Sequence, residues 1–247
     1  MAAARSNRTL SRPISSAHAG FLNLPIDLSK SSYRQVLAVA HPLFLFQDPG
    51  CRIESFGPER PPQWLALLYT NRQISDEVKT VLHSTNEFAF EEETKRQGNL
   101  LKSFLDCIGS VNAGFLSYIR MSFPATEGVD GQLDEIRIRE DGWQTLRLLQ
   151  EHCANLKALE TLVYGPNCIL ITDKEINVRF LQDALQDINT QLRAIRRLDR
   201  IIVKIRSGSP AHQIAEFMQQ LGWIVLPRNR EINPSTTVVG GPRYILL

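Results

Sequence analysis

The chain has 247 residues, 43% hydrophobic and 22% charged, as expected of an ordinary globular protein. Its 28 basic and 26 acidic residues leave a net charge of +2, so composition gives no reason to expect nucleic acid or an anionic membrane as a partner. No apolar run approaches the roughly 20 residues that span a bilayer. A chain of this length can bury about three quarters of its unfolded surface, which favours one main folded unit.

The first 19 residues form a small basic segment that contains Arg5, Arg8 and Arg12 and no acidic residue. Because the segment is rich in Ala, Ser and Arg and lacks apolar periodicity, we predict a disordered tail over residues 1–19. A mitochondrial targeting segment has a similar composition, so that location stays open beside a cytoplasmic or nuclear one. The four cysteines include no C-x-x-C pair, which is typical of a protein with reduced thiols.

A helix, a hairpin and a second helix are predicted for the following part of the chain. Pro25 suits the first turn of a helix, where its missing N–H costs nothing. The segment 48–50, Asp-Pro-Gly, predicts a type II turn between strands at 43–46 and 51–56. Residues 63–82 then show apolar positions at helical spacing, and an ion pair of Arg72 with Asp76 is expected on this helix.

From residue 87 onward, strands and helices alternate. Strands are predicted at 87–90, 118–123, 159–164, 200–206, 223–226 and 244–247, and helices at 100–108, 143–153, 180–192 and 209–221. Ser209 is expected to cap the last helix, and Gly222 to end it.

Helices separate three strands that recur at intervals of about 40 residues, which favours parallel pairing and right-handed crossovers. The predicted fold class is therefore α/β, with an α+β character at the N-terminus and helices packed on a small, mainly parallel sheet. An irregular leucine-rich-repeat-like arrangement is the alternative.

No catalytic or metal-binding pattern stands out. The chain contains no phosphate loop, no G-x-G-x-x-G and no G-x-S-x-G. The five histidines include no H-x-x-x-H pair, so no metal site is predicted. His152 and Cys153 are adjacent on a helix and point about 100° apart, so the imidazole does not face the thiol. We predict helix-end packing for this pair, no enzymatic activity and no cofactor.

Basic side chains cluster near residue 200. They are Arg193, Arg196, Arg197, Arg200, Lys204 and Arg206. The first three end a helix, where cations complement the helix dipole, and aromatic residues do not interleave with the cluster. We predict a solvated helix end with charges along a strand; a contact with an anion or a nucleic acid is the alternative.

Two N-terminal segments carry a resemblance to a known family. The first segment supplies Leu24, Pro25, Asp27, Leu28, Tyr33, Val36 and Leu37, and the second supplies Asn71-Arg72-Gln73-Ile74, Glu77, Val81-Leu82, Ser84-Thr85-Asn86 and Phe88. Together they resemble fungal proteins with a degenerate F-box-like N-terminal domain. Ser29 and Ser32 replace the usual arginine and an aliphatic residue. The resemblance covers residues 20–125, and residues 126–247 are expected to form an α/β region packed with it as one unit.

The resemblance implies a non-enzymatic intracellular protein-interaction domain with an unknown protein partner. F-box proteins join a substrate to a cullin-type ubiquitin ligase through an apolar helical surface. The alternative implied function is therefore that of a substrate adaptor, with the ligase's linker protein as its partner. The implied binding residues are Leu24, Pro25, Leu28, Tyr33 and Leu37.

A competing prediction concerns the same segment. A helix this short is marginal without tertiary packing, so Leu24, Pro25, Leu28 and Tyr33 are expected to pack inward against the helix that follows. Sequence gives no indication of the oligomeric state.

Overall fold

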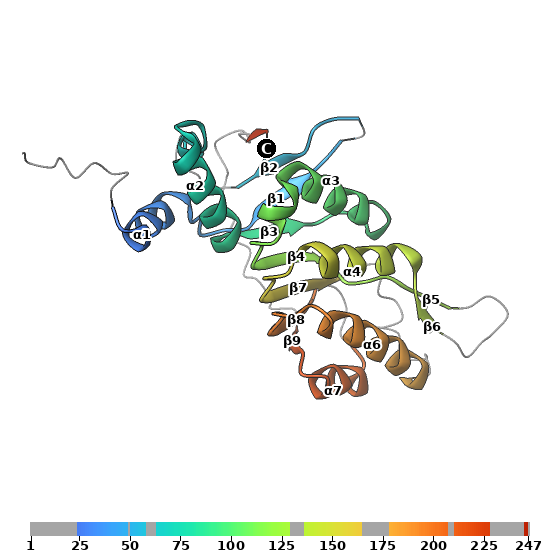
Figure 1. Cartoon of the computed structure of the whole chain (residues 1–247). Coiled ribbons are helices and arrows are strands. Elements are labelled where there is room, and N and C mark those ends of the chain that lie inside the picture. The colour runs from blue at the N-terminus through green and yellow to red at the C-terminus, as the bar shows by residue number, and fades with distance from the viewer. Residues whose placement is uncertain are drawn as a thin grey trace, which may run out of the picture.

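Eight strands form one sheet in the computed structural model of this chain, which describes residues 24–48, 50–57, 63–128, 136–164, 178–206, 210–227 and 245–246 (Figure 1). In spatial order the strands are β10 (Ile245–Leu246), β2 (Glu54–Phe56), β1 (Leu43–Phe46), β3 (Glu87–Phe90), β4 (Tyr118–Ser122), β7 (Ala158–Val163), β8 (Arg200–Ile205) and β9 (Ile224–Leu226). From β1 to β9 every neighbouring pair is parallel, whereas β2 is antiparallel to both of its neighbours. The predicted mainly parallel α/β sheet is confirmed. The predicted tail, residues 1–19, lies outside the described residues.

Six α-helices accompany the sheet in the described part of the chain. They are α1 (Ile26–Leu37), α2 (Arg72–Thr85), α3 (Thr94–Ala113), α4 (Glu140–His152), α6 (Val178–Arg193) and α7 (His212–Gln220). From β3 to β9, strands that are consecutive along the sheet follow one another in chain order, and α3, α4, α6 and α7 pack side by side in one layer (Figure 1). When all crossovers have the same handedness and each new strand is added on the same side of the previous one, the connecting helices lie on the same face of the sheet. We call the opposite face of β3, β4, β7, β8 and β9 the outer face.

The core lies between this helical layer and the sheet. Phe88 of β3 contacts both His83 of α2 and Phe104 of α3, with ring centroids 5.8 and 5.3 Å apart. On β8 the side chains of Ile201, Val203 and Ile205 are buried, while the alternating residues are more exposed. The predicted alternation on this strand is therefore confirmed.

The first helix is held by a buried amide. Asn86, which follows α2, donates to the carbonyl oxygens of Leu37 at 3.1 Å and Leu82 at 3.0 Å. Its Oδ1 accepts from the backbone N–H of Val39 at 2.9 Å. One side chain thus joins the end of α1 to the end of α2, which explains why a short, serine-rich helix is stable at this place.

Two predicted turns are confirmed. The N–H of Cys51 donates to the carbonyl oxygen of Asp48 at 2.9 Å, and Gly50 has a φ of +79°, as a type II turn requires; Pro49 itself lies outside the described residues. Gly222 ends α7 with a φ of +83°, and the following N–H, that of Trp223, donates back to Met218 at 3.0 Å.

Other predictions need correction. The single helix predicted at 63–82 is a 3₁₀ helix, η2 (Ala66–Tyr69), followed by α2, because the side chain of Asn71 accepts from the N–H of Ile74 at 3.0 Å and starts a new helix there. The N-cap of α7 is Ala211, and Ser209 lies outside the described residues.

The ion pair predicted between Arg72 and Asp76 is absent from the described residues, because Arg72 is the exposed first residue of α2 and Asp76 lies 3.8 Å from Lys79 instead. Within the described part, no helix is both long and apolar enough to cross a membrane.

We predict that Asn86→Leu lowers the free energy of unfolding by about 2–4 kcal/mol, because it leaves the buried N–H of Val39 and the carbonyl of Leu37 without their partner. Urea unfolding followed by circular dichroism measures the change. The control is Asn99→Ala, at an exposed position of α3, which should shift stability by less than about 0.5 kcal/mol. Equal effects of the two substitutions would contradict the role given to Asn86.

Candidate functional site

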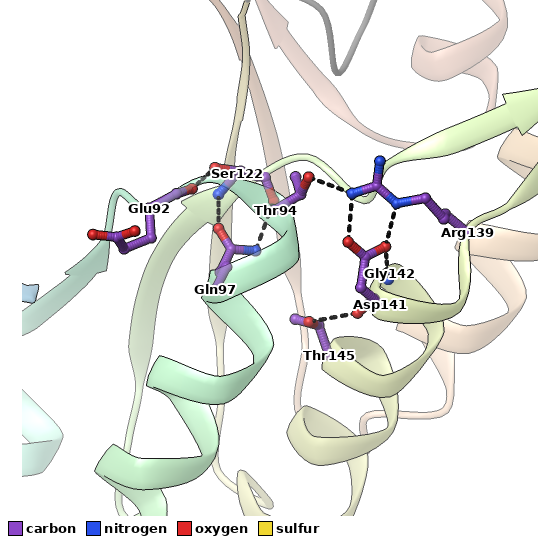
Figure 2. Close-up of polar contacts among 8 residues, drawn as sticks. All are labelled: Glu92, Thr94, Gln97, Ser122, Arg139, Asp141, Gly142 and Thr145. Atoms are coloured by element: carbon purple, nitrogen blue, oxygen red, sulfur yellow. Dashed lines mark hydrogen bonds and ion pairs between the residues drawn. The ribbon is translucent and has the colours of Figure 1, made fainter. Parts of the chain in front are cut away.

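The carboxyl ends of parallel strands are the usual place for a ligand in an α/β protein, which makes this edge of the sheet the first candidate for a functional site. A hairpin of β5 (Thr126–Gly128) and β6 (Ile136–Ile138), which the sequence did not reveal, follows β4 and leads into α4. Where β3 and β4 end and α3 and α4 begin, polar side chains gather (Figure 2). We call Glu92, Thr94, Gln97, Ser122, Arg139 and Asp141 the polar seam.

One half of the seam is an arginine–carboxylate pair. Arg139 donates to both carboxylate oxygens of Asp141, with 2.7 Å between Nε and Oδ1, and its Nη2 donates to Thr94 at 2.7 Å (Figure 2). The hydrogen bond to Asp141 raises the pKa of the Arg139 guanidinium. Asp141 also accepts from the N–H of Gly142 at 2.9 Å. The pair therefore joins the first turns of α3 and α4 and leaves its own charges satisfied.

The other half of the seam connects α3 to β4. Gln97, which is buried, accepts from the N–H of Ser122 at 2.6 Å, and its amide nitrogen lies 3.4 Å from the carbonyl oxygen of the same residue (Figure 2). The hydroxyl of Ser122 donates to the backbone oxygen of Glu92 at 3.0 Å and lies 3.1 Å from the hydroxyl of Tyr164. Gln97 thus continues the hydrogen bonding of β4 beyond its last sheet partner.

The cavity beside the seam has a volume of about 10 Å³, which holds at most a single water molecule. Two larger depressions, of about 270 and 210 Å³, flank α3 at the surface and are lined by exposed side chains such as Arg96 and Lys102. Among the described residues, no group of three His, Cys, Asp or Glu side chains is arranged to hold a metal ion. Among the described residues of the seam, the polar groups bind one another and enclose no space larger than a water molecule.

The only adjacent thiol and imidazole of the chain lie at the end of α4. Cys153 is fully buried, and burial raises the pKa of its thiol to about 12. A thiol with such a pKa does not supply a thiolate at neutral pH, so Cys153 has the properties of a core residue.

We predict that iodoacetamide at pH 8 modifies Cys51 and Cys107, which are exposed, and spares Cys153 in the native protein. Peptide mass spectrometry after a timed reaction measures the modified fraction at each position. Denaturation in urea before labelling should make the three sites equally reactive. Rapid labelling of Cys153 in the folded chain would show that the thiol is accessible and ionised.

A second polar cluster lies on the outer face of the sheet. Arg120 of β4 stands at its centre, with Nη2 2.7 Å from Glu87 and Nε 2.7 Å from Glu160. Glu160 of β7, which is buried, also lies 2.8 Å from Nζ of Lys204 and accepts from the hydroxyl of Tyr118 at 2.8 Å. Glu91 is 3.8 Å from Arg120 and 3.9 Å from Arg206. We call these seven residues the outer-face ion cluster; they are Glu87, Glu91, Tyr118, Arg120, Glu160, Lys204 and Arg206.

The ion cluster divides the basic group predicted from sequence. Lys204 and Arg206 lie on the outer face beside carboxylates. Arg193 instead donates from Nη2 to the carbonyl oxygen of Leu221 at 3.0 Å, at the end of α7. The six cations therefore do not form one continuous surface for an anion.

Ionisation at the cluster depends on its cations. Burial opposes ionisation of Glu160, but the hydrogen bonds from Lys204 and Tyr118 and the charge of Arg120 outweigh it, so the pKa of Glu160 is lowered. Burial dominates at Glu87 and raises the pKa of its carboxyl group. A carboxyl group whose pKa is lower in the folded than in the unfolded state stabilises the fold at pH values above its unfolded-state pKa. This stabilisation is lost as the pH falls through the folded-state pKa.

We predict that Glu160→Gln lowers the free energy of unfolding at pH 7 by about 2–4 kcal/mol, because it leaves the largely buried Arg120 and the partly exposed Lys204 without their shared carboxylate. The difference from the unsubstituted protein should shrink as pH falls through the lowered pKa of Glu160, where this carboxyl group itself becomes protonated. Urea unfolding at pH 7 and pH 3 measures both effects. Glu127→Gln, which removes the surface pair with Arg137, is the control and should cost less than about 1 kcal/mol at either pH.

The residues implied by the F-box-like resemblance divide between the two sides of α1. This helix buries Ser29, Tyr33 and Leu37, and the hydroxyl of Tyr33 donates to Glu77 at 3.0 Å. Leu24 is half-buried and Pro25 is exposed. The inward packing predicted for Tyr33 is confirmed.

The inward packing predicted for Pro25 and Leu28 is wrong, because Pro25 is exposed and the Leu28 side chain is 55% exposed. The cause is helical spacing: Ser29, Tyr33 and Leu37 recur every four residues on the buried side, and Leu28, Ser32 and Val36 form a second row about 100° around the helix from it. Val36 is 44% exposed. We call Leu28, Ser32 and Val36 the outward row of α1. Of the five implied binding residues, Tyr33 and Leu37 are buried in the core.

No protein-family model matches the chain, and neither the curated proteins nor the solved structures include a significant match to it. The F-box-like resemblance of residues 20–125 therefore stays a prediction.

Proposed function

We propose that this chain is a non-enzymatic, intracellular protein-interaction domain that contacts its partner through α1. The observation that carries the proposal is the exposure of Leu28 and Val36 on the outward row of a helix whose other side is fixed in the core. Apolar side chains that recur on one face of a helix are a common means of binding another protein. Because Tyr33 and Asn86 anchor α1, its outward row is presented without the cost of ordering a loose segment.

The arrangement of the sheet supports the same proposal. In α/β enzymes of the doubly wound type, ligands bind where the strand order reverses and helices change faces. Here the strands from β3 to β9 advance in one direction, and the polar seam at the ends of β3 and β4 leaves a cavity of only about 10 Å³ beside it. This one-sided succession of strand and helix also favours the irregular leucine-rich-repeat-like arrangement as a finer description of the fold.

A second candidate function is that of a substrate adaptor for a cullin-type ubiquitin ligase. The observation that favours it is that Leu28 belongs to the F-box-like segment and is exposed. An adaptor needs an apolar helical surface for the ligase's linker protein, and the outward row with the exposed Ile26 supplies apolar side chains on α1. The buried Tyr33 and Leu37 would then support this helix without contacting the linker.

We predict that Leu28→Asp combined with Val36→Asp leaves the melting temperature within about 2 °C of the unsubstituted value, because both side chains are exposed. The same double substitution should abolish binding to the partner. Differential scanning calorimetry measures the first effect. Pull-down of the purified ligase linker protein and affinity purification from the native cell measure the second.

The matched control is Asn99→Asp combined with Gln186→Asp, which adds the same charge at exposed positions of α3 and α6. This control should retain its partners. The adaptor function fails if the unsubstituted chain does not bind the linker protein. The wider proposal fails if every partner recovered from the cell is bound equally well by the Leu28/Val36 variant.

A further inference from the structure

A second surface lies at the far end of the sheet from β1 and β2. On β8 and the residue after it, Arg200, Ile202, Lys204 and Arg206 alternate with the buried core residues and therefore face outward. In the parallel register Ile202 pairs with Ile224 and Lys204 with Leu226, so these side chains share the outer face. We call the six residues Arg200, Ile202, Lys204, Arg206, Ile224 and Leu226 the β8–β9 patch.

The patch combines exposed cations with exposed apolar side chains. Arg206 is 48% exposed, Ile224 44% and Leu226 39%, although the last two belong to a strand of the sheet. The other residue of β9, Val225, packs against the core, so the exposure results from the direction of the side chains and not from an unpacked strand. Exposed aliphatic side chains on a strand beside cations are typical of a binding surface.

The charges of the patch are only partly neutralised. Lys204 shares Glu160 with Arg120, and Arg206 lies 3.9 Å from Glu91, which Arg120 also approaches. No ion pair of Arg200 occurs among the described residues. Three outward cations thus lie beside two carboxylates that are shared with a fourth basic residue, Arg120, which leaves an excess of positive charge over the patch.

We propose that the β8–β9 patch binds an extended acidic peptide segment whose carboxylates alternate with aliphatic side chains. Alternate residues of an extended chain are about 6.7 Å apart, and the outward residues of β8 have the same spacing. Carboxylates of the segment would then meet Arg200, Lys204 and Arg206, and its aliphatic side chains would cover Ile224 and Leu226. The proposal does not depend on the outward row of α1.

The chemistry of the patch favours a peptide over a nucleic acid. The six residues include no aromatic side chain on which a base could stack. Three of the six are aliphatic, which suits the side chains of a peptide better than a phosphate backbone. Glu91 and Glu160 border the cations and repel a continuous row of phosphates more strongly than spaced carboxylates.

The test uses the full chain and a fluorescein-labelled octapeptide of alternating Glu and Val, titrated by fluorescence anisotropy. We expect saturable binding that weakens at least tenfold in the variant Arg200→Glu/Arg206→Glu and at least fivefold in Ile224→Ser/Leu226→Ser. Arg200→Glu alone breaks no ion pair of the described structure and should weaken binding about threefold. It tests the proposal independently if the double variant does not fold. The matched control is Arg72→Glu/Arg147→Glu, which changes the net charge equally at exposed positions on α2 and α4 and should bind as the unsubstituted chain does.

Four results would overturn the proposal. They are no binding at 1 mM peptide, equal binding of the peptide with Gln in place of Glu, an equal loss in the Arg72/Arg147 control, and tighter binding of a labelled dodecathymidylate than of the peptide. The last result would identify the patch as a nucleic-acid contact. A Leu28→Asp/Val36→Asp variant should bind the octapeptide normally, so the outcome is independent of the function proposed for α1.

Discussion

The handedness of the crossovers between parallel strands is the constraint on which this structure depends. From β3 to β9 the strands join the sheet in chain order, so right-handed connections bring α3, α4, α6 and α7 to one face (Figure 1). The helical face takes the large apolar residues of each strand, as Phe88 shows beside Phe104. The remaining side chains of these strands lie on the outer face. Its central charges are stabilised there because Nε of Arg120 lies 2.7 Å from Oε1 of Glu160.

The packing of the helices on one face of the sheet also affects where a ligand or a partner can bind. A sheet with helices on both faces creates a crevice where its strand order reverses, whereas from β3 to β9 the order does not reverse, and the ends of β3 and β4 are joined to α3 and α4 by Arg139 with Asp141 and by Gln97 with Ser122 (Figure 2). The surfaces proposed for binding lie elsewhere: α1 packs against α2 beside the first strands, and the β8–β9 patch lies at the opposite end of the sheet.

Features that depend on neighbouring residues were predictable from sequence, and features that depend on distant partners were not. The alternation of β8 and the end of α7 at Gly222 follow from local periodicity and backbone freedom. The seam was missed because nothing near Gln97 in sequence indicates that its amide will meet Ser122 across the helix–sheet contact. Leu28 was misplaced for the same reason: the buried side of α1 is chosen by Glu77 and Asn86, which accept and donate hydrogen bonds some fifty residues later in the chain.

The central claim is that all apolar residues facing the helical layer are protected, whereas those of the outer face near β9 and of the outward row of α1 meet solvent. Hydroxyl-radical footprinting with mass spectrometry tests this claim at the level of single side chains in the native chain. The account predicts rapid oxidation of Leu28, Val36, Ile224 and Leu226 and slow oxidation of the two buried methionines, Met121 and Met218, although methionine is intrinsically the more reactive residue. Oxidation of Met121 and Met218 at rates typical of free methionine, with Ile224 and Leu226 protected, would contradict it.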